Sequence, residues 1–366
     1  MPQSRLPILL GRRHRAIAAL VVLTVLWGST FTVTELLCKR LDVHRAAHLP
    51  ESLWRMHADG HPQFAPHADT TPLIYSALRF GLVTLLLGWF LRQRIRRLLN
   101  RRALGYGLVL GAVAGIGMIL QTYGLQRTSP SVSAFLTALN VPFTALLIWI
   151  FWRTRPSLPL ALGIGMAFVG VGVISLGPAE AGAVVRNELP LLGEMMTVAC
   201  ALLFAWHTIL IDRYTKREDA MVLTWGMFAA MAVVSLVPLP LFAGGEALIR
   251  PGFWHDVGSD ALLLGNLAYI VLLPTLLGFS LMMLYQREIE PSQAAVVYAL
   301  EPLHATGISV AFGRESLEWW KVVGGALIVG GNLVAEILHP EARHARRQRR
   351  QQRQQRRHPS ACAPHV

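Results

Sequence analysis

The chain has 366 residues, of which 53% are hydrophobic and only 15% are charged, and its mean hydropathy is +0.45. Soluble domains carry about 25% charged residues, so this composition argues against an ordinary soluble protein. The net charge of +13 would suit nucleic acid, but the basic residues lie in short blocks between apolar runs, which indicates a membrane protein and no specific nucleic-acid partner. Three widely spaced cysteines without a CxxC pair predict neither a disulfide framework nor a metal site, and no motif calls for a cofactor.

Ten apolar runs are long enough to cross the hydrocarbon layer, which takes about 20 helical residues. Lipid cannot hydrogen-bond to an exposed backbone, so each run is predicted to be a transmembrane helix in an all-α protein. In chain order the runs cover residues 16–34, 71–91, 103–126, 128–152, 156–179, 195–211, 221–245, 261–286, 291–313 and 317–338.

Lysine and arginine are distributed unevenly between the two sets of alternating loops. The set that includes both termini holds 24 of the 34 residues, among them the block "RQRIRRLLNRR" at 92–102. Because cytoplasmic loops carry the Lys/Arg excess, residues 1–15 and the tail 339–366 are predicted to be cytoplasmic in a multi-pass protein of the cell (inner) membrane. The Arg/Gln-rich tail is interpreted as a disordered extension that reinforces this orientation, and a contact with anionic lipid or RNA is the alternative.

The predicted outer loop, at about 40–70, is longer than the other loops and rich in histidine. It contains His44, His48, His57, His61 and His67. Pairs at a fixed helical or hairpin spacing, as metal ligands require, are missing. A flexible histidine-containing loop is therefore predicted in preference to a metal site.

The second half of the chain repeats features of the first half at an offset of 160 residues. "QRTSPSVSAFLTALNVPFTALLI" (126–148) aligns without a gap with "QREIEPSQAAVVYALEPLHATGI" (286–308), and Pro142 aligns with Pro302. Five helices separate the copies, which is an odd number, so the repeats 16–179 and 180–338 are predicted to be inverted relative to each other. Inverted five-helix repeats are typical of secondary transporters with a site at the membrane midplane.

Both aligned prolines are predicted to bend their helices, and Glu301 lies at the second bend. An ionisable side chain near the bilayer centre costs roughly 2.5–3.5 kcal/mol and normally faces a bundle interior or water. Glu301 is therefore predicted to face a cavity, the alternative being a carboxyl group that only supports packing. His304, one turn later, is a candidate to share a proton with it, which would make protons the coupling ion.

Other residues are candidates for lining the same cavity. Arg79 is predicted either to bind an anionic substrate group or to be a fixed strut paired with Glu301 or a carbonyl. Aromatic walls with a few hydroxyl groups suit an amphipathic metabolite, and interhelical packing is the alternative role. The remaining candidates are Trp27, Ser29 and Thr30 in the first helix, Trp206 and His207 in the sixth, and Asn140 and Tyr298 beside the two prolines.

Several segments in this order resemble the EamA-type transporters of the drug/metabolite transporter superfamily. They are "LWGSTF" (26–31), "ALRFGL" (77–82), "LQRTSPSVSAFLTALNVPFTALL" (125–147), "LLGEMMTVACALLFAWHTILIDRY" (191–214), "EPSQAAVVYALEP" (290–302), "GRESL" (313–317) and "GGNLVAE". The resemblance implies ten helices in two inverted five-helix halves and alternating access. It also implies small metabolites or drugs as substrates, with export of amino acids or their derivatives as the leading hypothesis.

An intramembrane enzyme or a non-transporting membrane subunit is the alternative function. Such an enzyme would have to use His207, Glu301 and His304, because these are the candidate acid–base groups within the apolar runs. No HExxH or GxSxG motif accompanies them, so the chain is not expected to be an enzyme.

Overall fold

The computed structural model describes residues 6–56, 60–153, 158–177, 190–285 and 297–337. The described chain is almost entirely helical. Its elements are α1 (Leu6–His48), η1 (Glu51–Leu53), β1 (Trp54–Met56), β2 (Pro62–Phe64), α2 (Thr71–Leu98), α3 (Arg101–Leu125), α4 (Pro130–Thr137), α5 (Asn140–Trp152), α6 (Leu158–Ser175), α7 (Pro190–Tyr214), α8 (Ala220–Leu236), η2 (Leu239–Leu241), η3 (Ala243–Ile249), α9 (Pro251–Ser259), α10 (Ala261–Ile270), the π-helix η4 (Val271–Leu277), α11 (Gly278–Tyr285), α13 (Glu301–Ala311) and α14 (Trp319–Ile337).

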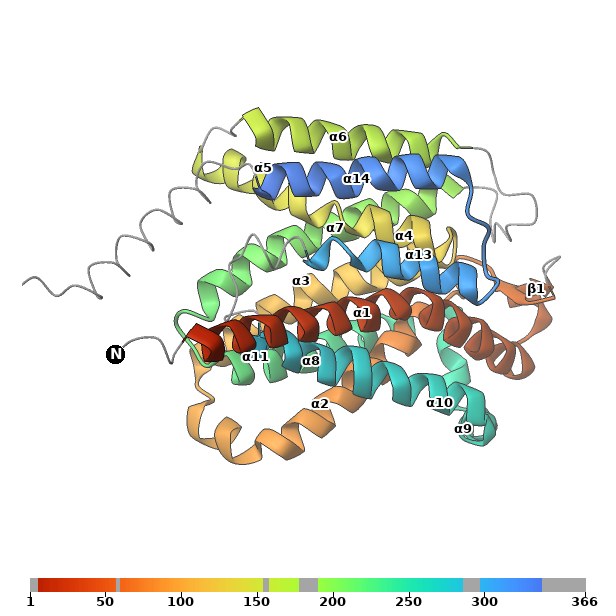
Figure 1. Ribbon diagram of the computed structural model, residues 1–366. Coiled ribbons are helices and arrows are strands. Elements are labelled where there is room, and N and C mark those ends of the chain that lie inside the picture. The colour runs from red at the N-terminus through yellow and green to blue at the C-terminus, as the bar shows by residue number, and fades with distance from the viewer. Residues whose placement is uncertain (1–5, 57–59, 154–157, 178–189, 286–296, 338–366) are drawn as a thin grey trace, which may run out of the picture.

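The long helices lie side by side along one direction, with α6 and α14 at one edge of the bundle and α2 at the other (Figure 1). Seven helical runs of the described chain are long and apolar enough to span a membrane, with α4 and α5 forming one run. An eighth is the pair Pro251–Ser259 and Ala261–Leu277, which is bent by 81°. The protein is therefore a multi-pass membrane protein.

The run 221–245 is an α-helix only as far as Leu236, the end of α8. In the described residues, α13 covers part of the run 291–313, and the apolar stretch of α14, Trp319–Ala335, is shorter than a standard span. Residues 291–296 lie outside the described residues. The run 128–152 is divided into α4 and α5 at residues 138–139. The N-terminal residues 1–5 and the Arg/Gln-rich tail from 338 lie outside the described residues.

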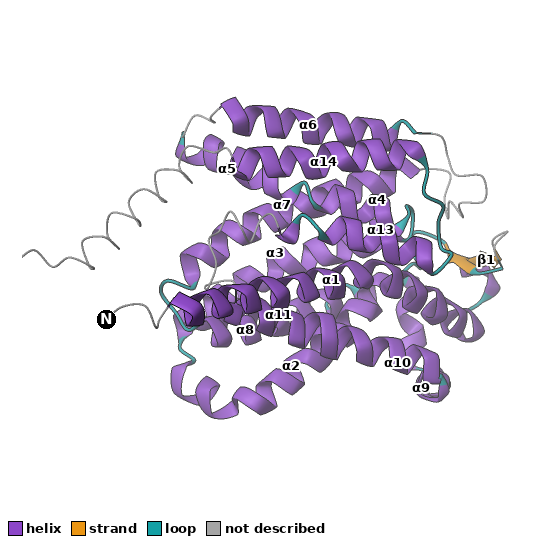
Figure 2. Cartoon of the chain, viewed as in Figure 1, coloured by secondary structure: helices purple, strands orange, loops and turns teal. Residues whose placement is uncertain are grey.

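The prediction of a flexible loop at about 40–70 was wrong for most of its length. Helix α1 continues to His48, and the antiparallel strands β1 and β2 follow, with Arg55 opposite Gln63 (Figure 2). Arg45 ties this segment to the bundle, because its fully buried guanidinium donates hydrogen bonds to Thr71 and to the Ala68 carbonyl. We call the end of the molecule that carries β1 and β2 the hairpin end.

Two histidines of this segment, His44 and His48, contact carboxylates of the second half of the chain, whereas His57 lies outside the described residues. His44 Nε2 lies 2.8 Å from Asp260 Oδ2, and His48 Nε2 lies 2.8 Å from Asp256 Oδ2. Burial raises the pKa of Asp260, but hydrogen bonds from Arg40, the Leu263 amide and His44 lower it more, so the pKa lies below its ordinary value. These contacts hold the end of α1 against α9 and α10.

Polar side chains cap the N-termini of several helices. They accept hydrogen bonds from the amide groups of the first turn, which have no partner within the helix. Asn100 accepts hydrogen bonds from the amides of residues 102 and 103 at the start of α3. Asp260 does the same for the amide of Leu263 at the start of α10. The two N-caps are 160 residues apart, which is the offset of the sequence repeat.

Small residues allow the closest helix contacts of the bundle. Helices α6 and α14 meet where a Cβ on Gly170 would lie 2.6 Å from the Gly324 carbonyl, and a Cβ on Gly324 would lie 2.8 Å from the Gly170 carbonyl. Hydrophobicity does not drive helices together in lipid, so such close backbone packing stabilises the pair.

Candidate functional site

Helix α1 lies against α13 at the position of Gly28, within the "LWGSTF" segment. A Cβ at this position would lie 2.8 Å from the Ala305 amide nitrogen and 3.0 Å from the Glu301 carbonyl oxygen. Glycine therefore allows the two backbones to touch. The contact places the first turn of α13, which includes Glu301 and His304, directly beside α1.

Glu301 and His304 are both partly buried. His304 Nδ1 lies 3.2 Å from Thr24 Oγ1 on α1. In the described part of the chain, neither a hydrogen bond nor an ion pair connects the Glu301 carboxyl group to another side chain. The Glu301 side chain occupies the first turn of α13, where the helix dipole favours a negative charge.

Arg79 does not pair with Glu301, which was one of the alternatives predicted for it. The guanidinium on α2 is 6% exposed and donates from Nε to Thr275 Oγ1 (3.0 Å) and from Nη1 to the Tyr75 hydroxyl (3.1 Å). The Tyr75 hydroxyl also lies 2.8 Å from Thr34 Oγ1 on α1. Three hydroxyl-bearing residues from three elements therefore position the charge.

The π-helix η4 supplies polar atoms to both α1 and α2. Its interior contains Pro274, which has no amide hydrogen and so interrupts the regular helical bonding. The Pro274 carbonyl accepts a hydrogen bond from Trp27 Nε1 at 3.0 Å. The next residue, Thr275, accepts from Arg79 and donates to the Ile270 carbonyl at 2.7 Å. Single π-helical turns are frequent at functional sites.

A series of aromatic rings connects these polar groups across the bundle. Neighbouring ring centroids are 5.3–6.1 Å apart, which is the usual range for interacting aromatic pairs. The series runs through Tyr298, Trp27, Phe279, Phe228 and Phe80. Its members belong to both halves of the sequence, so the interior that they line is shared between the halves.

The other residues that were predicted to line the cavity contact different parts of the bundle. Ser29 Oγ lies 2.6 Å from the Tyr269 hydroxyl, whereas Thr30 bonds to the Trp27 carbonyl within its own helix. On α7, His207 Nε2 lies 3.2 Å from Met227 Sδ, and Trp206 packs against Phe151 with ring centroids 5.1 Å apart. The structure thus joins Trp27, Tyr298 and His304 around α1, while Trp206 and His207 contact α5 and α8.

Asn140 begins α5, directly after the break that separates it from α4. Pro142 follows in the first turn and cannot donate to the carbonyl of residue 138, four positions earlier. Asn332 Nδ2 of α14 donates to this Ala138 carbonyl at 3.0 Å. In the second half a break at residues 299–300 precedes Pro302 in the same way.

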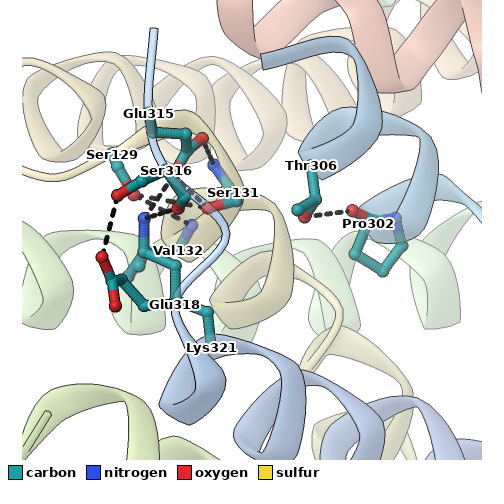
Figure 3. A network of polar contacts seen from close by, with 9 residues as sticks. All are labelled: Ser129, Ser131, Val132, Pro302, Thr306, Glu315, Ser316, Glu318 and Lys321. Carbon is teal, nitrogen blue, oxygen red and sulfur yellow. Dashed lines mark hydrogen bonds and ion pairs between the residues drawn. The ribbon is translucent and has the colours of Figure 1, made fainter. Parts of the chain in front are cut away.

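A buried ion pair lies where the segment after α13 joins α14, at the hairpin end of the bundle. Figure 3 shows its residues. Lys321 Nζ lies 2.6 Å from Glu315 Oε2, and both side chains are 1% exposed. The Glu315 carboxylate also accepts hydrogen bonds from the amide and hydroxyl of Ser131 in the first turn of α4. Burial raises the pKa of Glu315, but the charge of Lys321 and these hydrogen bonds lower it more, so it lies below its ordinary value.

The sequence analysis did not identify Tyr75, Tyr269, Thr275 or Phe279 as part of this region. Neutral residues of these types occur throughout membrane helices, so composition does not distinguish them. Pro274 was an available signal, because a proline inside an apolar run predicts an irregular turn whose freed carbonyl needs a donor.

Comparison with known proteins divides the chain into two parts, as the sequence repeat does. The sequence profile of the EamA-like transporter family matches twice, at residues 63–176 and 191–336. This protein belongs to the EamA-like transporter family. Helix α1 precedes the first match, so the long segment between α1 and α2 separates the first helix from the rest of its half.

Three relatives of this EamA-like chain bear the name of uncharacterized transporters. YyaM of Bacillus subtilis is 26% identical over 72% of this chain and 84% of its own length. A transporter of Archaeoglobus fulgidus is 23% identical over 87% of this chain and 84% of its own. The transporter sll1319 of Synechocystis is 23% identical over 66% and 69%.

The fold of this EamA-like protein is similar to that of a solved structure. It is described only as the crystal structure of a protein, and it superposes with a TM-score of 0.54 at 18% sequence identity. The match covers 90% of this chain and 99% of the other. At this identity the likeness concerns the fold alone.

Proposed function

We propose that this protein is a secondary-active transporter that exports a small metabolite by alternating access. Its transport site would lie between two inverted five-helix repeats, 16–179 and 180–338. The substrate class proposed is an amino acid, an amino-acid derivative or a drug-like compound. Membership of the EamA-like family and the names of its relatives support the transport role.

The observation that carries the proposal is the exchange symmetry of helix contacts between the halves. Helix α1 packs on α13, and its counterpart in the second half, α7, packs on α5, the counterpart of α13. Counterparts also meet each other directly, in the pairs α2–α8 and α6–α14. Such contacts arise when two like units face each other across a two-fold axis, as in inverted-repeat transporters.

The inversion has a direct test. Cysteines in place of Arg127 and Arg287, which are aligned in the repeat, are labelled with an impermeant maleimide in cells and in inverted vesicles. Arg287 itself lies outside the described residues. The proposal predicts reaction from opposite sides of the membrane, with residue 287 and both termini on the cytoplasmic side of the inner membrane. Labelling of both cysteines from the same side contradicts it.

Proton coupling is a second part of the proposal. It is supported by Glu301 and His304, which lie together beside α1 in the interior of the bundle. Efflux from reconstituted vesicles should respond to a pH gradient in the native protein and lose this response in Glu301→Gln. A response that persists in Glu301→Gln would remove Glu301 from the coupling mechanism.

The alternative of an intramembrane enzyme is less well supported. His207 contacts α8, whereas His304 contacts α1, and in the described ranges no group of three His, Cys, Asp or Glu side chains is placed to hold a metal ion. Elemental analysis of the purified protein distinguishes the two functions. A stoichiometric metal would favour the enzyme.

A further inference from the structure

Arg79 is a buried cation whose partners are neutral. Its side chain is 6% exposed, and it lies eight residues into α2, within the apolar part of this helix. Its hydrogen bonds go to the hydroxyl groups of Tyr75 and Thr275. Hydroxyl groups stabilise the guanidinium through dipoles but leave its net charge uncompensated.

The other basic residues that are buried in the described ranges have carboxylate partners. Each lies within ion-pair distance of a carboxylate, in the pairs Lys39–Glu35, Arg45–Asp42 and Lys321–Glu315. For Arg79, no carboxylate of the described ranges lies within that distance. A buried charge without a counterion is strongly unfavourable. An anion that enters the bundle would supply the missing charge.

The guanidinium is also held in a fixed orientation. Thr275 is fixed by its hydrogen bond to the Ile270 carbonyl, and Tyr75 by its contact with Thr34. The Nε hydrogen and one Nη1 hydrogen of Arg79 donate to these two hydroxyl groups. Within the described residues, the Nη2 hydrogens and the second Nη1 hydrogen can still donate to a further acceptor. A carboxylate can pair with two guanidinium nitrogens in this way.

The ring of Phe80 next to Arg79 belongs to the series of aromatic rings that crosses the bundle. The Arg79 guanidinium lies 5.3 Å from the ring centroid of Phe80, which stacks on Phe228, and Phe228 contacts Phe279. Phe279 in turn contacts Trp27. A ligand whose charged group binds Arg79 would thus place its remaining atoms among aromatic side chains.

We propose that Arg79 binds the anionic group of the transported substrate, and that this substrate is a carboxylate with an apolar, aromatic body. Tyr75 and Thr275 are positioning residues that orient the guanidinium. This inference rests on the proposed transport function, since it names the chemical class of the substrate at the same site.

Protection from arginine modification tests the proposal with simple aromatic acids as probes. The protein in vesicles is treated with phenylglyoxal, and modification of Arg79 is followed by peptide mass spectrometry. The probes are phenylacetate, 3-phenylpropionate and phenylalanine, each compared with its methyl ester. We expect Arg79 to react, and we expect at least one acid to slow the reaction while its ester does not. Arg92, exposed on the same helix, is the internal control.

Two variants distinguish binding from a structural role. In Tyr75→Phe and Thr275→Val, the acid concentration for half-protection should rise about tenfold or more, because each removes an orienting hydrogen bond to a charged group. Both variants should elute as the native protein in size-exclusion chromatography. Half-protection that is unchanged in both variants would contradict the positioning role.

The proposal is overturned if Arg79 stays unmodified while Arg92 reacts, if no acid protects it, or if esters protect as well as acids. These outcomes are separable from failure of the transport function. If Arg79 does not react with phenylglyoxal but Glu301→Cys is labelled from both sides of the membrane, the transport proposal stands and the Arg79 site is contradicted. If acids specifically protect Arg79 but Glu301→Cys is labelled from neither side, the anion site stands and alternating access is contradicted.

Discussion

Gly28 determines how closely α1 approaches α13, because a Cβ at this position would lie 2.8 Å from the backbone nitrogen of Ala305. Backbone atoms cannot rotate away as the end of a side chain can. In Gly28→Ala we therefore expect a loss of about 1–3 kcal/mol in the free energy of unfolding, typical of overpacking. Thermal unfolding in detergent, followed by size-exclusion chromatography, measures the change.

Gly81→Ala on α2 is the matched control for Gly28→Ala, because nothing lies within 4 Å of a Cβ at position 81. We expect its stability to be unchanged or slightly higher, since alanine favours helix by roughly 1 kcal/mol over glycine. Equal stability of the two variants would show that the contact between α1 and α13 is not close.

The sequence predicted the site residues that carry an ionisable group inside an apolar run. Glu301, Arg79 and His304 were identified because an ionisable group in lipid needs a reason to be there. Thr275 was not, since it is neutral and its distance in the chain from Arg79 does not reveal which helices meet. Tyr75, four residues before Arg79 on the same helix, was predictable as a neighbour from the helical spacing but was not identified. The partner of Arg79 depends on how η4 lies against α2, which only the fold provides.

Among the helical elements, the break between α4 and α5 depends on a residue in a distant helix. Pro142 cannot donate to the Ala138 carbonyl, which accepts hydrogen bonds from the Val141 amide at 3.4 Å and from Asn332 Nδ2 of α14 at 3.0 Å. Asn332→Leu should destabilise the protein by about 0.5–1.5 kcal/mol, the usual net contribution of one hydrogen bond. Thermal unfolding of the variant in detergent gives the magnitude.

A double-mutant cycle identifies the cause of the Asn332→Leu effect. Pro142→Ala restores an amide hydrogen that can reach the Ala138 carbonyl, so Asn332→Leu should be less destabilising in the Pro142→Ala background. Additive losses for Asn332→Leu and Pro142→Ala would mean that Asn332 acts elsewhere.

The contact between α4 and α14 depends on pH through Glu315. Because the pKa of this carboxyl group is lowered on folding, its contribution to stability is present above its ordinary pKa and is lost as pH falls through the lowered value. The unfolding temperature of the native protein should therefore fall more steeply below about pH 4.5 than that of Glu315→Gln. Parallel pH profiles would contradict the assignment.

Glu315→Gln itself should be destabilising by about 3–5 kcal/mol at pH 7, because Lys321 would remain buried without its carboxylate. The double variant Glu315→Gln, Lys321→Met removes the unpaired charge and should recover much of this loss. The unfolding temperatures of both variants at neutral pH supply the comparison.

The predicted elements agree with the structure where hydropathy alone decides the outcome. The long runs became α2, α3, α6 and α7 with similar bounds, whereas α8 ends at Leu236, well before the predicted end at 245. The extension of α1 to His48 was missed, because the polar residues of its last turns predict a loop. They are ordered by distant partners instead, such as Asp260 for His44, which periodicity along one segment does not reveal.

At the scale of the whole molecule, ion pairs between the two halves gather at the hairpin end. Glu35 on α1 lies 2.8 Å from Arg314, which precedes α14. If this end opens during transport, a bifunctional maleimide joining Glu35→Cys to Arg314→Cys should abolish efflux of a compound that the unlinked protein exports. The native cysteines are replaced by alanine in all variants.

The control cross-link joins Arg55→Cys to Gln63→Cys, which face each other in the β-hairpin within one half. It should leave efflux near the level of the unlinked protein. Full efflux after cross-linking residues 35 and 314 would show that the hairpin end does not need to open.

The presence of two related halves was predictable from the repeat, because prolines and loop positions recur at a fixed offset. The depth at which the halves meet was not, since it depends on contacts such as those of Gly28 and of η4. Accessibility of residue 301 therefore tests the central claim most directly. In a variant with Glu301→Cys as its sole cysteine, alternating access predicts labelling by an impermeant maleimide from each side of the membrane. Labelling from one side alone, or from neither, would contradict it.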